Sequence, residues 1–314
     1  MLELHEIENF PVSHLSVSSI RQYMTDRQMF FRRYIRLEFD DKKNPALIEG
    51  SLFHLMLESY WNSIKQGKPG AIENGVWENG IARINSDDAK GLIDWGKTGS
   101  LPKSLETVEK ALDFYFAEVN KIAYTKVLDV ETKFLTDFED LDGKPMPIAL
   151  KGFTDLIVME NDDLIIRDHK LVSVVTSQEE INPFFEIAAG FYWFLVRKTY
   201  GLNPKKMVFD QVKKSKNRDG SPQLVPYTVE YTPLLIQKCL ELYRRIIFEL
   251  AGRPLIKDGV ACFIPNPFGS FGNEETWKDF SDEVEQGKVW NLQEFRKNKY
   301  DLANVQALEL DLEM

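Results

Sequence analysis

The segment of residues 150–171 limits how this chain can fold more than any other part of the sequence. Two apolar runs, residues 153–158 and 164–166, flank a short polar stretch, which is the pattern of a β-hairpin. Asp155 lies within the first run, and Asp168 lies two residues after the end of the second. The sequence therefore predicts a buried hairpin that carries one acid on each strand.

Lys170 adds a third charge to the hairpin, two residues after Asp168. Because side chains alternate between the two faces of a strand, Asp168 and Lys170 point the same way and His169 points the other way. Two acids and a lysine on one apolar hairpin cost desolvation free energy unless they pair or bind a metal. We therefore expect Asp155 and Asp168 to hold a hard cation, Mg²⁺ or Mn²⁺.

The order of the other predicted elements indicates the fold class. Helical periodicity comes first, then a strand and the hairpin, then a helix, two strands and a final helix. This order predicts an α/β (α+β) fold, in which a central mixed β-sheet is flanked by helices and preceded by a helical N-terminal region. Residues 66–104 are expected to form loops and short helices. The predicted helices cover residues 48–65, 104–123, 178–200 and 232–251, and the predicted strands cover residues 126–137, 205–213 and 223–231.

The chain is expected to divide into three parts along its sequence. Residues 1–125 are the helical N-terminal region, which carries a helix with His54, and residues 126–255 are the core. Residues 256–314 are expected to form an irregular tail that packs on the core, so that the three parts make one compact unit.

Composition restricts the class of protein. With 43% hydrophobic and 28% charged residues, the 314-residue chain is typical of folded soluble proteins. Its net charge of −10 argues against a general nucleic-acid coat, although a local basic groove is compatible with it. The two cysteines exclude a disulfide framework and a four-cysteine zinc or iron–sulfur site. We expect a cytoplasmic protein, because neither a signal peptide nor a membrane span is evident in the sequence.

The two charged strands resemble those of a known enzyme superfamily. Residues 152–155, Gly-Phe-Thr-Asp, and residues 166–170, Ile-Arg-Asp-His-Lys, resemble the PD-(D/E)xK nucleases. In this resemblance Asp155 matches the first acid, and Asp168 with Lys170 matches the (D/E)xK motif. The resemblance implies a restriction-endonuclease-like core and a nuclease activity.

Further residues resemble the RecB-like branch, which includes CRISPR-associated and phage-encoded exonucleases. Residues 50–54 match its Gly-x-x-x-His helix, in which the histidine is a metal ligand, and residues 16–18 match its Ser-x-Ser start. Tyr192 falls where the branch has its Gln-x-x-x-Tyr motif, but Ala188 replaces the glutamine, so that Tyr192 is either auxiliary to the site or part of the core. Many members hold an iron–sulfur cluster with four cysteines. This chain lacks those cysteines, and we expect no cluster.

The resemblance implies a role for each of these residues. The metal would be bound by His54, Asp155, Asp168 and the backbone carbonyl of His169. The first role of Lys170 would be to stabilise charge on the scissile phosphate, and its second would be to act as a base. The ion would activate water and stabilise the transition state. The nitrogen of a histidine favours Mn²⁺, whereas Mg²⁺ is the usual cellular ion. Glu131 on the preceding strand is either an outer ligand or an exposed strand residue.

Basic residues in two segments are candidate DNA contacts, and both segments have a second interpretation. The arginine pair at 32–33 and the basic cluster at 213–218 would bind phosphates if they faced DNA. Most charged side chains on a protein surface, however, are only solvated. The candidates are Arg32, Arg33, Lys213, Lys214, Lys216 and Arg218.

The first hypothesis for the function is a metal-dependent DNA nuclease, favoured as an exonuclease on DNA ends or single strands. It would act in recombination, repair or phage DNA metabolism, in a bacterial or phage-infected cell. An endonuclease of the same fold and a catalytically silent nucleic-acid-binding or assembly subunit are the alternatives, and a non-nuclease metal hydrolase ranks last. No ATP-binding Gly-x-x-x-x-Gly-Lys-[Ser/Thr] loop is present, so unwinding would need a separate helicase. A recombinase or a single-strand-binding protein is a further candidate partner.

Overall fold

The computed structural model describes residues 12–35, 37, 42–97, 99–139, 143–217 and 223–252. The chain forms two compact units that interleave along the sequence. Unit 1 consists of residues 1–39, 135–151 and 237–314, and unit 2 consists of residues 40–134 and 152–236. The division into three sequential parts stays a prediction, and the tail of residues 256–314 lies outside the described residues, as does Arg218.

Unit 1 contains the short N-terminal elements. The helices α1 (Val17–Thr25) and α2 (Arg27–Phe30) precede a π-helical turn (Phe31–Ile35), and β1 (His14–Leu15) pairs in parallel with part of β3. Ser16 caps α1, because its hydroxyl accepts a hydrogen bond from the Ser19 N–H while the Ser19 hydroxyl accepts one from the Ser16 N–H. The first serine of the Ser-x-Ser start is therefore the cap of this helix.

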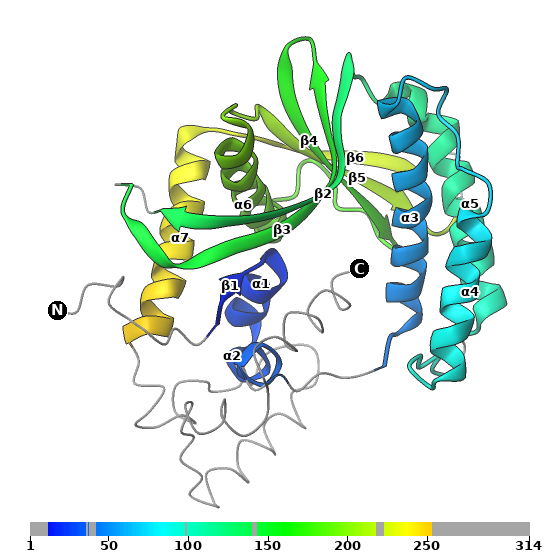
Figure 1. The fold of residues 1–314 in the computed structure, drawn as a ribbon, viewed down its shortest axis with the longest axis horizontal. Helices are drawn as coiled ribbons and strands as arrows, with labels where there is room; N and C mark the ends of the chain where they lie inside the picture. The colour runs from blue at the N-terminus through cyan, green and yellow to red at the C-terminus, as the bar shows by residue number, and fades with distance from the viewer. Residues whose placement is uncertain are drawn as a thin grey trace, which may run out of the picture. The chain divides into compact units, whose positions relative to one another are not determined.

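In unit 2 the helices α3 (Pro45–Lys65), α4 (Val76–Ala89) and α5 (Leu101–Glu118) lie side by side (Figure 1). The ring of Phe53 on α3 packs edge-on against Tyr115 on α5, and Trp61 Nε1 donates a 2.8 Å hydrogen bond to the Tyr115 hydroxyl. Helix α4 fills part of the segment that was expected to form loops and short helices. Its only buried residues are Gly80 and Ile84, which is too weak an apolar pattern to predict a helix of this length.

The central sheet is mixed, as the sequence predicts. Its order is β1-β3-β4-β5-β6, with β2 paired to β3 off this path (Figure 1). Strands β3 and β4 are antiparallel, β4 and β5 are parallel, and β5 and β6 are antiparallel. The strands are β2 (Lys126–Glu139), β3 (Pro145–Glu160), β4 (Asp163–Val172), β5 (Lys206–Lys213) and β6 (Leu224–Glu230).

Helix α6 (Pro183–Tyr200) provides the crossover that the parallel pair β4–β5 requires, and α7 (Pro233–Gly252) follows β6. Helix α6 begins five residues later than expected. The Asn182 side chain accepts hydrogen bonds from the N–H groups of Phe184 and Phe185, and Pro183 occupies the first helical turn. These capping residues outweigh the helical pattern of the residues before them.

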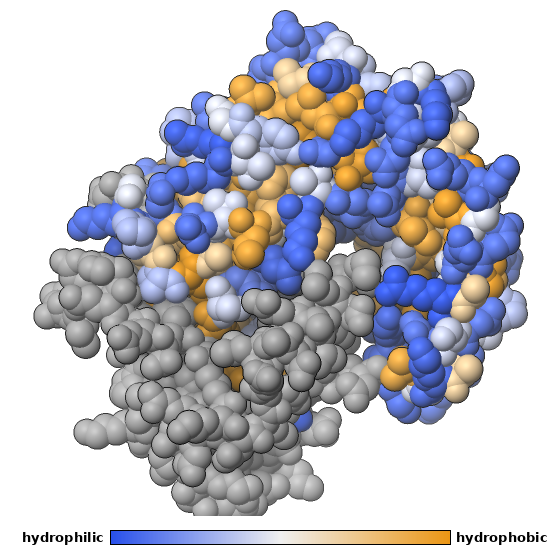
Figure 2. All heavy atoms as spheres, viewed as in Figure 1, coloured by the Kyte–Doolittle hydropathy of each residue, from blue (hydrophilic) through white to orange (hydrophobic). Residues whose placement is uncertain are grey.

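The core of unit 2 forms where α3 and α5 pack against strands of the sheet. Leu156, Ile165 and Val208 come from three adjacent strands, and together with Phe53 and Tyr115 they belong to one buried cluster. Figure 2 shows hydrophilic residues over much of the visible outer face of α3, α4 and α5. Within the described residues, no helix is long and apolar enough to cross a membrane.

Gly152 sets the distance between β3 and α6. A Cβ atom at this position would lie 2.9 Å from Leu195 Cδ1 and 3.0 Å from Tyr192 Cε1. We expect Gly152→Ala to destabilise the protein by about 1–3 kcal/mol, because a side chain forces the packed helix to move. The midpoint of urea unfolding measures this loss.

Gly50 offers a control on α3, since a Cβ atom there meets nothing within 4 Å. Gly50→Ala should stabilise the protein by about 0.5–1 kcal/mol, because alanine is the better helix former. Equal unfolding midpoints for wild type and Gly152→Ala would refute the close packing of α6 on β3.

Candidate active site

The pairing of β3 with β4 stops at the predicted acids. The ladder runs from Glu160–Asp163 to Leu156–Arg167, which places Asp155 and Asp168 immediately beyond its last pair. There the main-chain N–H of His169 donates a 2.5 Å hydrogen bond to Asp155 Oδ2. A side-chain carboxylate thus satisfies a donor on β4 at the point where the ladder ends.

Strand β4 remains fixed on its other edge. Its parallel pairing with β5 continues through Asp168, His169 and Lys170 to Val172, opposite Lys213. The main chain of the Asp-x-Lys segment is therefore ordered by β5, while its edge toward β3 is left for side chains. This arrangement makes room for polar groups within an apolar sheet.

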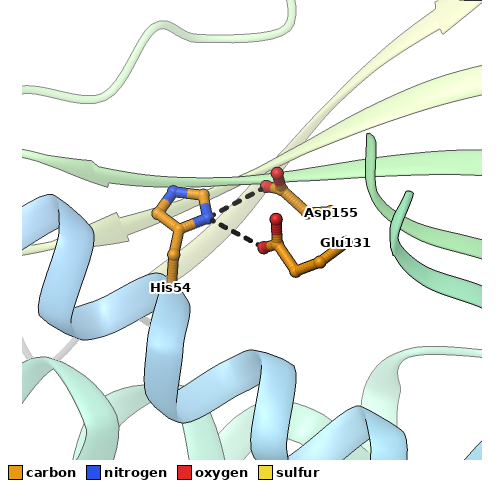
Figure 3. A group of neighbouring side chains, drawn as sticks. All are labelled: His54, Glu131 and Asp155. Carbon is orange, nitrogen blue, oxygen red and sulfur yellow. Dashed lines mark ion pairs between the residues drawn. The ribbon is translucent and has the colours of Figure 1, made fainter. Parts of the chain in front are cut away.

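Helix α3 brings His54 to the same point. Figure 3 shows the imidazole pointing toward two carboxylates from the strands, with Nδ1 at 3.4 Å from Asp155 Oδ2 and 3.6 Å from Glu131 Oε1. A ligand atom from each of the three residues lies within 4.8 Å of the others. The sequence placed His54 about a hundred residues before the hairpin, and the fold unites them.

Glu131 reaches this cluster through an unusual backbone conformation. Its φ angle is +47°, which is uncommon for a residue other than glycine inside a strand. Buried residues of β2 follow one another at spacings of three and four here, so that the strand does not alternate regularly. The local distortion turns the carboxylate toward His54, as bulges near active sites commonly do. The interpretation of Glu131 as an exposed strand residue does not fit its half-buried side chain.

Asp168 and Lys170 form a close ion pair, with Lys170 Nζ 2.8 Å from Oδ2 and 3.0 Å from Oδ1 of Asp168. They therefore do share a face of β4, as the alternation predicts. Asp168 is buried, whereas the Lys170 side chain is 43% exposed, so that this side chain is open to a substrate. Burial and the charge of Asp155 raise the pKa of Asp168, and Lys170 only partly opposes this.

The residues present fit a divalent cation. One imidazole nitrogen and two carboxylate oxygens are donors that Mn²⁺ and Mg²⁺ accept, and their spacings of 3.4 and 3.6 Å are close to the separation of neighbouring ligands around such an ion, about 3 Å. The buried Asp168 Oδ2 lies 2.8 Å from Lys170 Nζ without the geometry of a hydrogen bond, so a bound ion would share this oxygen with the ammonium group. The sequence ranked Asp168 above Glu131, but the group of ligand atoms that lie within 4.8 Å of one another comprises His54, Glu131 and Asp155.

A sequence profile described as the PD-(D/E)XK nuclease superfamily matches residues 14–262, which is most of the chain. The chain belongs to this superfamily. The resemblance inferred from the two charged strands is therefore confirmed, and so is the α/β fold with a mixed sheet. Membership in the nuclease superfamily indicates a hydrolase of phosphodiester bonds that acts on nucleic acid, and nucleases of this superfamily use divalent metals.

Two solved structures are similar to this nuclease-superfamily chain at low sequence identity. A "Putative exonuclease" from Eubacterium rectale is 11% identical, with coverage of 98% of this chain and 99% of that chain and a TM-score of 0.49. The protein SSO0001 is 12% identical, with coverage of 74% of this chain and 84% of that chain and a TM-score of 0.29. No curated protein sequence matches the chain.

The other predicted residues of this superfamily member lie in varied surroundings. Tyr192 is half-buried on α6, where its ring packs beside Gly152, so its place agrees with a core role. Lys213 donates a hydrogen bond to Asn217, and Lys214 donates one of 2.6 Å to Glu49. Lys216 is exposed, and Arg32 and Arg33 belong to unit 1. Their roles in DNA binding stay predictions.

The sequence interpretation missed one further group of residues. Arg167 and Asp210 form a buried ion pair on β4 and β5, and the ring of His169 lies next to it. The sequence did contain a signal for this group, because Asp210 is a carboxylate within the apolar strand predicted for residues 205–213.

The carboxylates of the site raise the pKa values of two basic side chains, His54 and Lys170. Burial lowers the pKa of His54, but the charge of Asp155 and the neighbouring Glu131 carboxylate more than offset it, so that the pKa is raised to about 9. Burial likewise lowers the pKa of Lys170, and the charges of Asp168 and Asp155 outweigh it, so that the net direction is upward. Both groups are therefore cationic near neutral pH.

We predict that His54 titrates near pH 9 in protein stripped of metal by a chelator. Glu131→Gln should lower this pKa, because it removes a negative charge beside the imidazolium. Nuclear magnetic resonance of the histidine Cε1–H groups measures both values, and His54→Gln assigns the signal.

A divalent cation must displace the His54 proton, so its affinity should rise as the pH increases toward 9. Glu106→Gln, a surface change on α5, is the control and should leave the His54 pKa unchanged. A His54 pKa near the ordinary 6.5, or one that Glu131→Gln does not lower, would contradict this account of the site.

Proposed function

We propose that this chain is a divalent-metal-dependent deoxyribonuclease whose active site lies at the end of the β3–β4 ladder. The observation that carries the proposal is the convergence of His54, Glu131 and Asp155, beside the Asp168–Lys170 pair, in a chain of a nuclease superfamily. Four elements, α3, β2, β3 and β4, supply these groups, which a purely structural cluster of acids would not require.

His54, Asp155 and Glu131 would hold the ion, together with Asp168 and the carbonyl of His169. When bound, the ion would make a water molecule more nucleophilic and stabilise negative charge on the phosphate. The protein contributes the fixed positions of the donors, since β4 is held by β5 and Asp155 is held by the His169 N–H.

Lys170 acts in this proposal as a charge stabiliser rather than as a base. Its raised pKa favours the ammonium form, and an ammonium group donates hydrogen bonds to phosphate oxygens. Asp168 holds Nζ in place and remains buried while Lys170 is accessible. The pair therefore presents a positive charge to the substrate from a fixed position on the strand.

The choice of DNA and of an exonuclease mode rests on the resemblance to the RecB-like branch. That resemblance comprises the Gly50-x-x-x-His54 helix, the Asp168-x-Lys170 strand and the position of Tyr192. The pathway, the protein partners and the cellular location stay predictions from the sequence. So does the absence of an iron–sulfur cluster, since Cys262 lies outside the described residues.

We expect the wild-type protein to cleave labelled DNA with Mn²⁺ or Mg²⁺ and to stop when a chelator is added. Asp168→Asn and Lys170→Ala should each lower kcat by roughly 100-fold to 1,000-fold, because each removes a group that acts on the reacting phosphate or its ion. Rates measured under single-turnover conditions report this step directly.

Matched controls come from the other end of β4 and from the loop before β5. Asp163 and Lys205 form an exposed ion pair of 2.8 Å, and Asp163→Asn and Lys205→Ala should keep wild-type rates. If wild type and both site variants cleave DNA at equal rates, the cleavage does not come from the proposed active site. If none of the folded proteins cleaves with either metal, the catalytically silent subunit becomes the better assignment.

The exonuclease mode has a separate test. We expect linear single-stranded or duplex DNA to be degraded and covalently closed circles of the same sequences to remain intact, because an exonuclease needs an end. Gel analysis of both substrates under the same metal concentration distinguishes the modes. Cleavage of the circles by wild type, but not by Lys170→Ala, would instead assign an endonuclease.

A further inference from the structure

A buried ion pair lies next to the residues of the site on strand β4. Arg167 Nε donates to Asp210 Oδ2 at 2.9 Å and Nη2 donates to Oδ1 at 2.6 Å, so the contact is bidentate. Asp210 is 1% exposed and Arg167 is 7% exposed. Burial raises the pKa of Asp210, but the charge of Arg167 outweighs it and the net direction is downward, so the carboxylate stays ionised.

The ring of His169 is held against this pair. His169 Nδ1 lies 3.3 Å from Asp210 Oδ2, a close polar contact that lacks the geometry of a hydrogen bond, and the ring of Tyr115 packs edge-on against the imidazole with 5.4 Å between the ring centroids. Tyr115 is itself fixed by the 2.8 Å hydrogen bond from Trp61. With 1% exposure, the imidazole of His169 has little freedom to move.

The main chain of His169 belongs to the site although its ring does not. Its N–H donates the 2.5 Å hydrogen bond to Asp155 Oδ2, and its neighbours in the sequence are Asp168 and Lys170. Because the β3–β4 ladder ends at Leu156–Arg167, no further main-chain pair of that ladder orders this side of His169. A rotation of the residue would shift Asp155, Asp168 and Lys170 together.

We propose that Asp210 is a positioning residue, which fixes the main chain between Asp168 and Lys170 through its contact with the His169 ring. The proposal rests on the proposed function, in that the positioned groups are those proposed to hold the divalent cation. Asp210 acts without touching the metal or the substrate, as carboxylates behind metal-ligating groups do in other sites.

Stability alone explains the pair poorly. Replacing a buried ion pair with apolar side chains of similar size is often neutral or stabilising, so this part of the core does not need charges in order to fold. By contrast, a carboxylate that orients a neighbouring residue through a polar contact must keep its charge. The two explanations differ in what a change at Asp210 does to metal affinity at a temperature where the protein is fully folded.

The test measures Mn²⁺ binding by isothermal titration calorimetry, without DNA, on folded proteins of known unfolding temperature. Asp210→Asn removes the charge, and His169→Phe keeps the ring against Tyr115 but cannot make the polar contact with Asp210. Both should bind Mn²⁺ about tenfold or more weakly than wild type. In chelated protein, the amide hydrogen of His169 should also exchange faster in Asp210→Asn, because its bond to Asp155 is weakened.

Glu49→Gln is the matched control, since Glu49 is a buried carboxylate of unit 2 that accepts hydrogen bonds from Lys214 and Ser104. It should lower the unfolding temperature without changing Mn²⁺ affinity. If Asp210→Asn fails to fold because Arg167 is left unpaired, His169→Phe decides the outcome. Wild-type Mn²⁺ affinity in the folded variants would overturn the positioning role.

The failure of the proposed function gives a different result. A wild-type protein that binds Mn²⁺ through His54 but does not cleave DNA would refute the nuclease assignment and leave the role of Asp210 measurable by calorimetry. Conversely, active variants with unchanged Mn²⁺ affinity would leave the nuclease assignment intact and refute the role of Asp210.

Discussion

The site depends on the hydrogen bond from the His169 N–H to the carboxylate of Asp155. A buried main-chain donor without a partner costs roughly 1–3 kcal/mol, so the ladder between β3 and β4 cannot simply stop inside an apolar sheet. Asp155 satisfies the donor and keeps its carboxylate near His54. The same contact that completes the sheet therefore also fixes the first acid of the site.

The charges around this contact are balanced locally. Three acids, Asp155, Asp168 and Glu131, lie close to two cationic groups, the imidazolium of His54 and the ammonium of Lys170. Desolvation opposes the charges of His54 and Lys170, and the neighbouring carboxylates more than offset it, which explains why the pKa values of both groups are raised despite burial. A divalent cation that replaced the His54 proton would offset the one negative charge by which the three acids exceed the two cationic groups.

Two features near the site cost free energy. The backbone of Glu131 has a positive φ angle, a conformation that costs on the order of 1–3 kcal/mol and persists only where the surroundings enforce it. The pair of Arg167 and Asp210 places two charges in the core of unit 2. The first feature brings Glu131 close to His54, and the second lies beside His169 on β4, which favours a role in the site for both.

The sequence by itself determined the local elements and the chemistry of the hairpin. Alternation along residues 150–171 predicts that Asp168 and Lys170 share a face, and their 2.8 Å contact agrees with it. The resemblance in residues 50–54 pointed to His54, and the order of strands and helices indicated a mixed sheet. These features follow from patterns that repeat within a few residues.

Only the tertiary structure decided which distant groups complete the site. The distortion of β2 turns Glu131 toward His54, and the parallel pairing of β5 with β4 places Asp210 beside His169. Neither follows from local periodicity, because a strand pattern does not show where its regular geometry breaks or which strand becomes its neighbour. For the same reason helix α4 was not predicted, since its position depends on the close approach of Gly80 to Leu52 of α3.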